Sequence, residues 1–176
     1  MVSLTPVTSE NWRDVIAVRA NDAQGDWVAD VSFYLCLSTY GDVWRSCAVL
    51  DGDVVVGHVM WGVDPEDDSH WLGGLVIDRE RQGRGLGRAT VDAVLALWEQ
   101  EPALSGTPYT QAALSVSPDN TSAIALYTSL GFTETGEMSD DELSAAGISD
   151  ALVRISVGVE DCRDLLKEYR EALDAL

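Results

Sequence analysis

Apolar residues along this chain of 176 residues follow two spacings, which alternate from one end to the other. Short apolar runs bounded by Gly, Pro or Asp predict β-strands, and apolar residues that recur every three or four positions predict helices. We expect strands at 4–8, 44–50, 54–61, 70–77, 109–116, 132–137 and 151–157. We expect helices at 12–20, 31–40 and 121–130, another after residue 88, and a helical tail at 159–176.

Turn residues indicate how several of these elements connect. Asp51-Gly52 lies between two apolar runs, which is a strong hairpin signal. Gly41 and Gly131 each follow a predicted helix, and glycine is the usual residue just after a helix end. We therefore expect three successive antiparallel strands, 44–50, 54–61 and 70–77, before the next helix.

A glycine-rich turn separates strand 70–77 from that helix. Gly83, Gly85 and Gly87 stand at alternate positions, and glycine lets the backbone approach a ligand closely because no Cβ intervenes. The helix after the turn carries apolar residues on one face: Val91, Val94, Leu95 and Trp98. Its first N–H groups have no partner within the helix, and Arg84 and Arg88 add positive charge. This combination suits a phosphate or pyrophosphate.

The spacing of the loop excludes two common phosphate-binding motifs. A P-loop requires a Lys after its glycines, and none follows here. The dinucleotide fingerprint requires a third glycine where Arg88 stands. The pattern Q-x-x-G-x-G remains, formed by Gln82, Gly85 and Gly87. A glycine-rich connection without a ligand is the alternative.

A second motif follows strand 109–116. The pattern N-x-x-A-x-x-L-Y-x-x-x-G-F is formed by Asn120, Ala123, Leu126, Tyr127, Gly131 and Phe132. Together the two motifs resemble the signatures of the GNAT N-acetyltransferases, and the resemblance covers roughly residues 4–157. It implies one α/β (α+β) domain over residues 1–158, with a mixed, mostly antiparallel central sheet flanked by helices. Residues 159–176 are then a helical extension that packs on the core or on another subunit, with a frayed terminal helix as the alternative.

The resemblance implies acetyl-CoA as co-substrate and no metal. The residues expected to bind it are Leu75, Val76, Ile77, Gln82, Gly83, Arg84, Gly85, Leu86, Gly87, Arg88, Asn120 and Tyr127. In the family, the strand before the loop pairs with the pantetheine arm, one strand N–H polarises the thioester carbonyl, and the loop amides hold the pyrophosphate. A pure helix cap is an equal alternative for Asn120.

Acetyl transfer to an amine needs an acid that protonates the leaving thiolate. A phenol, with a pKa of about 10, is suitable, and Tyr127 stands where the family carries its catalytic tyrosine. A tyrosine that packs on the core by its ring is the alternative. Direct transfer in a ternary complex follows if no residue is acylated. A cysteine nucleophile is the rival, but Cys36 and Cys47 lie outside both motifs.

The sequence leaves the general base unassigned. Many relatives carry a Glu on the strand before the glycine loop, whereas residues 71–77 contain no acid. His58 and His70 are candidates by residue type, with a structural or surface role as the alternative. A water chain that ends at carboxylates would serve as well.

Within the family, the chain looks most like the spermine/spermidine (diamine) acetyltransferases. The segments that carry this likeness are Asn11-Trp12, Trp27-Val28-Ala29, 56–62 and 132–137. Acidic residues that could pair with a polycation are Asp26, Asp30, Asp64, Glu66, Asp67 and Asp68, with surface solvation as the alternative for each. Gly73 and Gly74 replace a bulky aromatic residue and an Arg of that branch, so we expect an acceptor pocket that is wider or shaped for another amine.

Two other functions stay open at this point. One is an acetyltransferase for a protein N-terminus or lysine, and the other is a module that binds acetyl-CoA without turnover. The net charge of −19 disfavours nucleic acid as a partner and favours a small cationic amine, although solubility or salt adaptation explains it equally well.

Composition indicates where the protein works. No apolar run is long enough to span a bilayer, and the N-terminus has no signal-peptide pattern. Cys36, Cys47 and Cys162 show neither metal nor redox spacing, so we expect buried thiols in a cytoplasmic protein. Relatives are often dimers, and a homodimer is a further expectation.

Overall fold

The structure, a computed structural model, describes residues 1–25, 27–65, 68–100, 111–137 and 153–158. Seven strands form one sheet in the order β1-β2-β3-β4-β5-β7-β6. The strands are β1 (Val2–Pro6), β2 (Arg45–Asp51), β3 (Val54–Val63), β4 (His70–Ile77), β5 (Gln111–Val116), β6 (Thr133–Glu137) and β7 (Val153–Gly158). The helices are α1 (Trp12–Ala17), the 3₁₀ helix η1 (Asp22–Gln24), α2 (Val31–Tyr40), α3 (Leu86–Gln100) and α4 (Thr121–Thr128).

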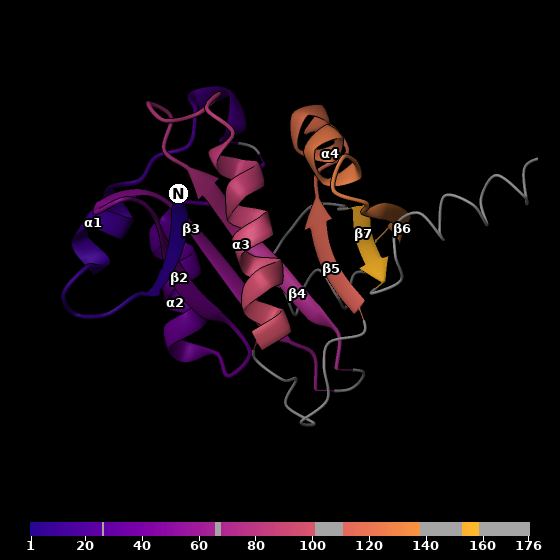
Figure 1. The fold of residues 1–176 in the computed structure, drawn as a ribbon, viewed down its shortest axis with the longest axis horizontal. Helices are drawn as coiled ribbons and strands as arrows, with labels where there is room; N and C mark the ends of the chain where they lie inside the picture. The colour runs from indigo at the N-terminus through magenta and orange to yellow at the C-terminus, as the bar shows by residue number, and fades with distance from the viewer. Residues whose placement is uncertain (26, 66–67, 101–110, 138–152, 159–176) are drawn as a thin grey trace, which may run out of the picture.

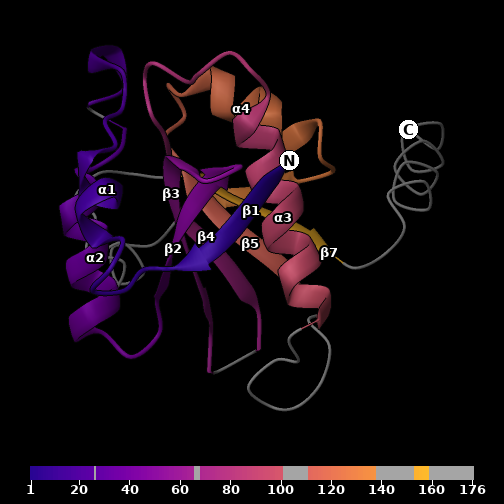
Figure 2. The same cartoon turned by 60° about the vertical axis from the view of Figure 1, so that its left-hand side comes forward.

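The helices cover both faces of this sheet. Figures 1 and 2 show α1 and α2 on one face and α3 on the other, with α4 near one end of β5. Pairing is antiparallel throughout except between β4 and β5, which are parallel. The predicted α/β fold with a mixed, mostly antiparallel sheet flanked by helices is therefore confirmed.

Several element boundaries differ from the predictions by a few residues. Helix 31–40 and strand 70–77 have the predicted bounds, but the first strand begins at Val2 and ends at Pro6. Helix α1 ends at Ala17, because the chain turns at Val18 into an extended conformation (φ −58°, ψ 131°). The predicted tail helix at 159–176 lies outside the described residues.

The predicted hairpin between β2 and β3 is confirmed. Gly52 adopts a φ of 63°, a left-handed conformation that glycine reaches without a steric penalty. Beyond the predicted end at residue 61, β3 continues to Val63, which pairs with His70 of β4. The long β3 thus supports β4 along almost its whole length.

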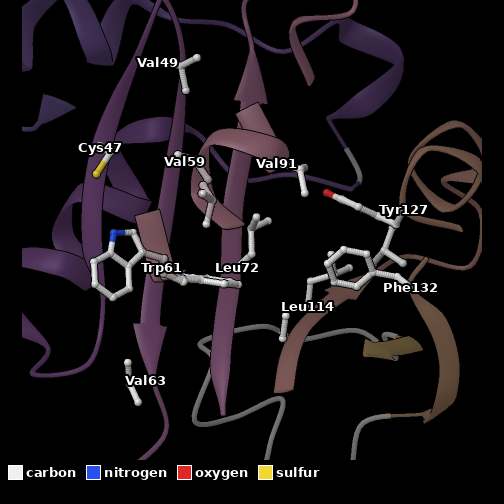
Figure 3. Close-up of a cluster of buried hydrophobic side chains, with 14 of the residues drawn as sticks. Cys47, Val49, Val59, Trp61, Val63, Leu72, Val91, Leu114, Tyr127 and Phe132 are labelled. Atoms are coloured by element: carbon white, nitrogen blue, oxygen red, sulfur yellow. The ribbon is translucent and has the colours of Figure 1, made fainter. Parts of the chain in front are cut away.

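The larger core lies between the sheet and helices α3 and α4. Figure 3 shows Trp61 of β3, Val91 of α3 and Tyr127 of α4 in this cluster, together with Phe132, which follows α4. On α3, the predicted face is confirmed: Val91, Val94 and Trp98 are buried, and Leu95 packs against the same cluster. A smaller cluster lies under α1 and α2, around Val15, Val18, Val31, Ala48 and Val76.

The cysteines follow the prediction in part. Cys47 is buried, and this burial raises the pKa of its thiol. The expectation of a buried thiol is wrong for Cys36, which is exposed on α2. The two are free thiols, and Cys162 lies outside the described residues.

Candidate active site

Strands β4 and β5 separate partway along their length. They pair at His70↔Ala112, Trp71↔Ala113 and Leu72↔Leu114, whereas β4 runs on to Ile77 and β5 to Val116. We call residues 70–72 the paired half of β4 and residues 73–77 its open half. The open half keeps its pairing with β3 on one side, so its other edge borders the gap between β4 and β5.

A β-bulge marks the boundary between the two halves. Met60 pairs with Gly73 but His58 pairs with Val76. Gly74 and Leu75 therefore lie together opposite the single residue Val59. Gly74 has a φ of 53°, which disfavours every residue with a side chain. A Cβ at this position would also lie 2.9 Å from Cγ of Tyr34. Glycine is therefore required here for both conformation and space.

Aromatic side chains occupy the space beside the two strand glycines. A Cβ on Gly73 would lie 3.3 Å from the Trp44 ring, and Gly74 faces the Tyr34 ring. Residues distant in sequence therefore occupy the room beside both glycines, and an acceptor pocket that is wider or shaped for another amine stays a prediction. Tyr34 is fixed by its hydroxyl, which accepts a hydrogen bond from the Ala29 N–H at 3.0 Å.

The glycine loop leads directly into the N-terminus of α3. Gly83 and Gly85 have φ values of 75° and 77°, and a Cβ at either would meet nothing within 4 Å. Conformation rather than space therefore demands glycine at these two positions. The Ala89 N–H donates to the Gly85 carbonyl at 3.1 Å, and the amides before it have no partner within the helix. Such a helix end suits an anion, so the predicted binding of pyrophosphate at this loop stays a prediction.

Gln82 ties this loop to two other parts of the chain. Its Nε2 donates to the Ile77 carbonyl at 2.9 Å and to Oε1 of Gln24 at 2.8 Å. The first bond links the loop to the end of β4, and the second links it to η1. The Gln82 side chain thus sets the position of the loop backbone.

The two loop arginines have different surroundings. Arg88 turns toward α4, where its guanidinium donates to Oγ of Ser129 at 2.7 Å and to the Ser129 carbonyl at 3.2 Å. Arg84 is exposed. Neither side chain lines the cavity described below, unlike the other ten predicted cofactor residues.

Asn120 begins α4 as its N-cap. Its side-chain oxygen accepts from the Ala123 N–H at 3.2 Å, so the predicted capping role is confirmed. Asn120 also lines the cavity, which leaves its predicted contact with coenzyme A a prediction.

Tyr127 lies on α4 and is 7% exposed. Its ring packs against Phe132 with centroids 5.8 Å apart, and Figure 3 shows the hydroxyl pointing away from Phe132. Burial, and secondarily the nearby Tyr34 phenol, raises the pKa of Tyr127 well above its usual value. The hydroxyl therefore stays protonated at neutral pH while the residue lines the cavity.

One cavity of about 310 Å³ connects all these features. Its lining joins the open half of β4, the glycine loop, the end of β5 and one face of α4. It is also lined by four aromatic residues that we call the aromatic wall: Trp27, Tyr34, Trp44 and Trp71. Met60 and Ser115 also line it, and neither was among the residues expected to bind acetyl-CoA. Within the described part of the chain, no charged side chain lines this cavity.

Both candidate histidines lie outside the cavity lining. His58 is fully buried, and burial lowers its pKa to about 4 against the opposing effect of its bond to Gly74. His70 is also buried, and burial lowers its pKa as well. Its ring meets the Trp98 ring edge to face at 5.2 Å. These surroundings agree with the structural alternative for both residues.

Three of the six acidic residues proposed to attract a polycation are described by the structure, and these three do not line the cavity. Asp30, Asp64 and Asp68 are absent from its lining, whereas Asp26, Glu66 and Asp67 lie outside the described residues. Among the residues that the structure covers, we find no cluster of three or more His, Cys, Asp or Glu side chains that could hold a metal ion. The described helices also include none that is long and apolar enough to cross a bilayer.

Solved structures share this fold at low sequence identity. An aminoglycoside acetyltransferase crystallised with coenzyme A and kanamycin has a TM-score of 0.70 and 19% identity, covering 91% of this chain and 96% of its own. A spermidine N-acetyltransferase from Vibrio cholerae, crystallised with coenzyme A and spermine, has a TM-score of 0.67 and 17% identity, with coverages of 92% and 97%. An N-acetyltransferase for an alanine of a ribosomal protein from Escherichia coli has a TM-score of 0.63 and 16% identity, with coverages of 92% and 96%.

Sequence comparison gives the family directly. A search of curated protein sequences finds no match. The family model described as the acetyltransferase (GNAT) family matches residues 12–132, which is more than half of the chain and spans both motifs. The divergent strands, the glycine loop and the buried tyrosine thus lie in a chain that belongs to the GNAT family of acetyltransferases.

Proposed function

We propose that this protein transfers the acetyl group of acetyl-CoA directly to the nitrogen of a primary amine. The observation that carries the proposal is the single cavity shared by the open half of β4, the glycine loop and Tyr127. These three features would meet the thioester arm, the pyrophosphate and the leaving sulfur of one extended molecule. The family model supports the same chemistry.

The glycine loop would hold the pyrophosphate through backbone amides. The N–H groups from Gly83 to Arg88 precede the first internal hydrogen bond of α3, and the helix dipole adds partial positive charge there. Arg84 is exposed beside the loop, whereas the Arg88 guanidinium is engaged with Ser129. Binding therefore depends mainly on backbone groups held in place by the Gln82 side chain.

The open half of β4 would accept the pantetheine arm as an added strand. Leu75, Val76 and Ile77 line the cavity on the edge that β5 leaves unpaired. Extended ligands pair with such edges through main-chain hydrogen bonds. An N–H in this segment would polarise the thioester carbonyl and stabilise the negative charge that develops on its oxygen.

Tyr127 would protonate the thiolate of coenzyme A as the carbon–sulfur bond breaks. The amine nitrogen forms a bond to the acetyl carbon, the electron pair of the old bond leaves on sulfur, and the phenol supplies the proton. Among the described residues, the Tyr127 hydroxyl makes no hydrogen bond, so it is available to the sulfur.

The acceptor amine would approach from the aromatic wall. A polyamine such as spermidine or spermine is the acceptor that the sequence resemblance favours. An amine carried on an apolar or aromatic body is the second candidate, and the aromatic wall favours it, because Trp27, Tyr34 and Trp44 offer flat apolar surface and cation–π contacts. A homodimer and a cytoplasmic location stay predictions.

Two measurements test this function. Calorimetry with coenzyme A should show binding, and the absence of heat would remove the proposal. Thiol release from acetyl-CoA should then be followed with spermidine, spermine, an aminoglycoside, phenethylamine and an N-terminal peptide. Release with one amine class identifies the acceptor. Binding without release in any of them would instead support a module that holds acetyl-CoA without turnover.

A further inference from the structure

We propose that His58 is a positioning residue that orients and polarises the backbone amide of Leu75 toward the thioester carbonyl. The inference rests on the proposed acetyl transfer, but its geometry belongs to the β-bulge. His58 Nδ1 lies 2.8 Å from the Gly74 carbonyl oxygen. The Gly74 carbonyl and the Leu75 N–H belong to the same peptide unit.

The direction of the Leu75 N–H follows from peptide geometry. A carbonyl oxygen can only accept, so Nδ1 carries the proton and donates it to Gly74. A trans peptide is planar, with its N–H opposite its C=O, so the Leu75 N–H points away from His58. His58 lies outside the cavity lining and Leu75 lies within it. The N–H is thus turned from the histidine side of the strand.

The bulge explains why this peptide needs an anchor. Gly74 adopts a φ of 53°, and glycine has more alternative backbone conformations than any other residue. Without an anchor, the 74–75 peptide could rotate and its N–H would lose a fixed direction. Stabilising a developing negative charge depends on donors that are oriented before the reaction begins.

His58 itself is held on several sides. Its Nε2 lies 3.0 Å from Oγ of Ser46, which is 2.6 Å from Oγ of Ser38. Its ring stacks on Tyr34 with centroids 5.8 Å apart and planes within 8°. The residue is 0% exposed. These contacts keep the Nδ1–H directed at Gly74.

The hydrogen bond also changes the amide electronically. A donor on a carbonyl oxygen shifts electron density toward that oxygen, and the N–H of the same peptide then becomes a better donor. His58 would thereby act on the reacting carbonyl through the peptide without touching it. The alternative is a buried histidine that merely satisfies its neighbours.

The test uses two variants that differ in where they place a donor. In His58→Asn the amide nitrogen can take the place of Nδ1, and in His58→Gln it can take the place of Nε2. Both variants lose the ring and its stacking on Tyr34, so they share the same structural defect. If His58 positions the Leu75 amide, His58→Asn keeps the hydrogen bond to the Gly74 carbonyl and the orientation of the amide. His58→Gln loses both.

Three readouts separate positioning from folding. For His58→Gln we expect kcat to fall about tenfold, less than the ~100-fold typical of deleting an oxyanion donor itself, with an unchanged KM for acetyl-CoA. For His58→Asn we expect kcat close to wild type. The Leu75 amide ¹⁵N resonance should move in His58→Gln and stay in His58→Asn. The carbonyl stretch of bound ¹³C-acetyl-CoA should shift back toward its value in water in the Gln variant.

Equal kcat values and equal Leu75 resonances in the two variants would overturn the inference. If neither variant folds, the imidazole ¹⁵N spectrum of the wild type decides. A proton on Nδ1 supports the inference, and a proton on Nε2 overturns it. If the wild type shows no turnover, the proposed function fails, yet the Leu75 resonance still tests whether His58 controls this amide.

Discussion

The two halves of β4 follow each other directly in sequence but differ in their strand pairing. In the paired half, His70, Trp71 and Leu72 pair with β3 on one side and β5 on the other. In the open half, β3 remains the partner on one side, and a bulge at Gly74 interrupts even that register. A short loss of strand pairing inside a sheet therefore exposes a strand edge to which an extended ligand can hydrogen-bond.

The largest predicted difference between the halves concerns two leucines. Leu72 is 3% exposed in the main core, so Leu72→Ala should lower the free energy of unfolding by about 3 kcal/mol. Leu75 is half-buried at the cavity, so Leu75→Ala should cost about 1 kcal/mol, because its surroundings already border solvent. Urea denaturation measures both.

The same pair should separate stability from binding. Calorimetry with coenzyme A should show weaker binding for Leu75→Ala than for folded Leu72→Ala, because Leu72 also lines the cavity but is only 3% exposed. Equal losses of stability, together with equal affinities, would mean that the two halves of β4 do not differ as described.

The next prediction concerns the residue that faces the open half from α4. Tyr127→Phe keeps the ring that packs on Phe132 and removes the hydroxyl. We expect kcat to fall about 100-fold, the lower end of the range for general acid catalysis, with coenzyme A affinity unchanged. Steady-state thiol release and calorimetry measure the two quantities. An unchanged kcat would remove Tyr127 from the acid role.

A smaller effect should distinguish the two glycines at the boundary of the halves. Gly74→Ala must hold φ at 53° and bring a Cβ to 2.9 Å from Tyr34, so we expect a loss of about 2 kcal/mol in unfolding free energy. Gly73→Ala should cost less, because its nearest obstacle is the flexible end of Met60 at 3.0 Å. Chemical denaturation of both variants provides the measurement, and a costlier Gly73→Ala would contradict the bulge geometry.

The smallest effect compares two buried histidines: His70 in the paired half of β4, and His58, which lies on β3 opposite Val76 of the open half. The pKa of His58 is about 4 in the folded protein and about 6.5 when unfolded, so below pH 6.5 the unfolded chain binds a proton that the folded chain refuses. Stability is therefore complete above pH 6.5 and declines as the pH falls toward 4. Between pH 6.5 and 5.5 the loss should be about 1 kcal/mol.

Many carboxylates also change the stability of this protein with pH, so the contribution of His58 is measured as a difference between wild type and a His58 variant. The difference in unfolding free energy between wild type and His58→Asn should shrink as the pH falls from 6.5 to 5.5. The pKa of His70 is also lowered by burial, so His70→Asn should show a change of the same sign. A pH-independent difference for His58→Asn would show that this histidine titrates normally.

Features set by neighbouring residues could be predicted from the sequence. The alternate glycines, the face of α3 and the Asn120 cap each depend on residues within one or two turns of chain. The two family motifs go further than local pattern, and ten of the twelve cofactor residues that they predict line one cavity. Helix α2 and strand β4 matched to the residue, since both are bounded by clear stop signals.

Features that join distant segments could not be predicted in this way. Nothing near Gly73 and Gly74 indicates that Trp44 and Tyr34 will cover them. The bond from Gln82 to Gln24 spans 58 positions, and Arg88 reaches Ser129 across 41. The sequence pattern predicted a phosphate contact for Arg88. Its hydrogen bonds to Ser129 depend instead on how α3 packs beside the end of α4.

The seam between β4 and β5 has a mechanical consequence. On one side of it lie β1 to β4 and on the other β5 to β7, each an antiparallel sub-sheet, and three residue pairs join them. A long cofactor bound in the gap would contact both sub-sheets where β4 and β5 are not paired, along residues 73–77 of β4. Cofactor occupancy should then register as a rise in melting temperature, with the two sub-sheets unfolding together rather than one after the other.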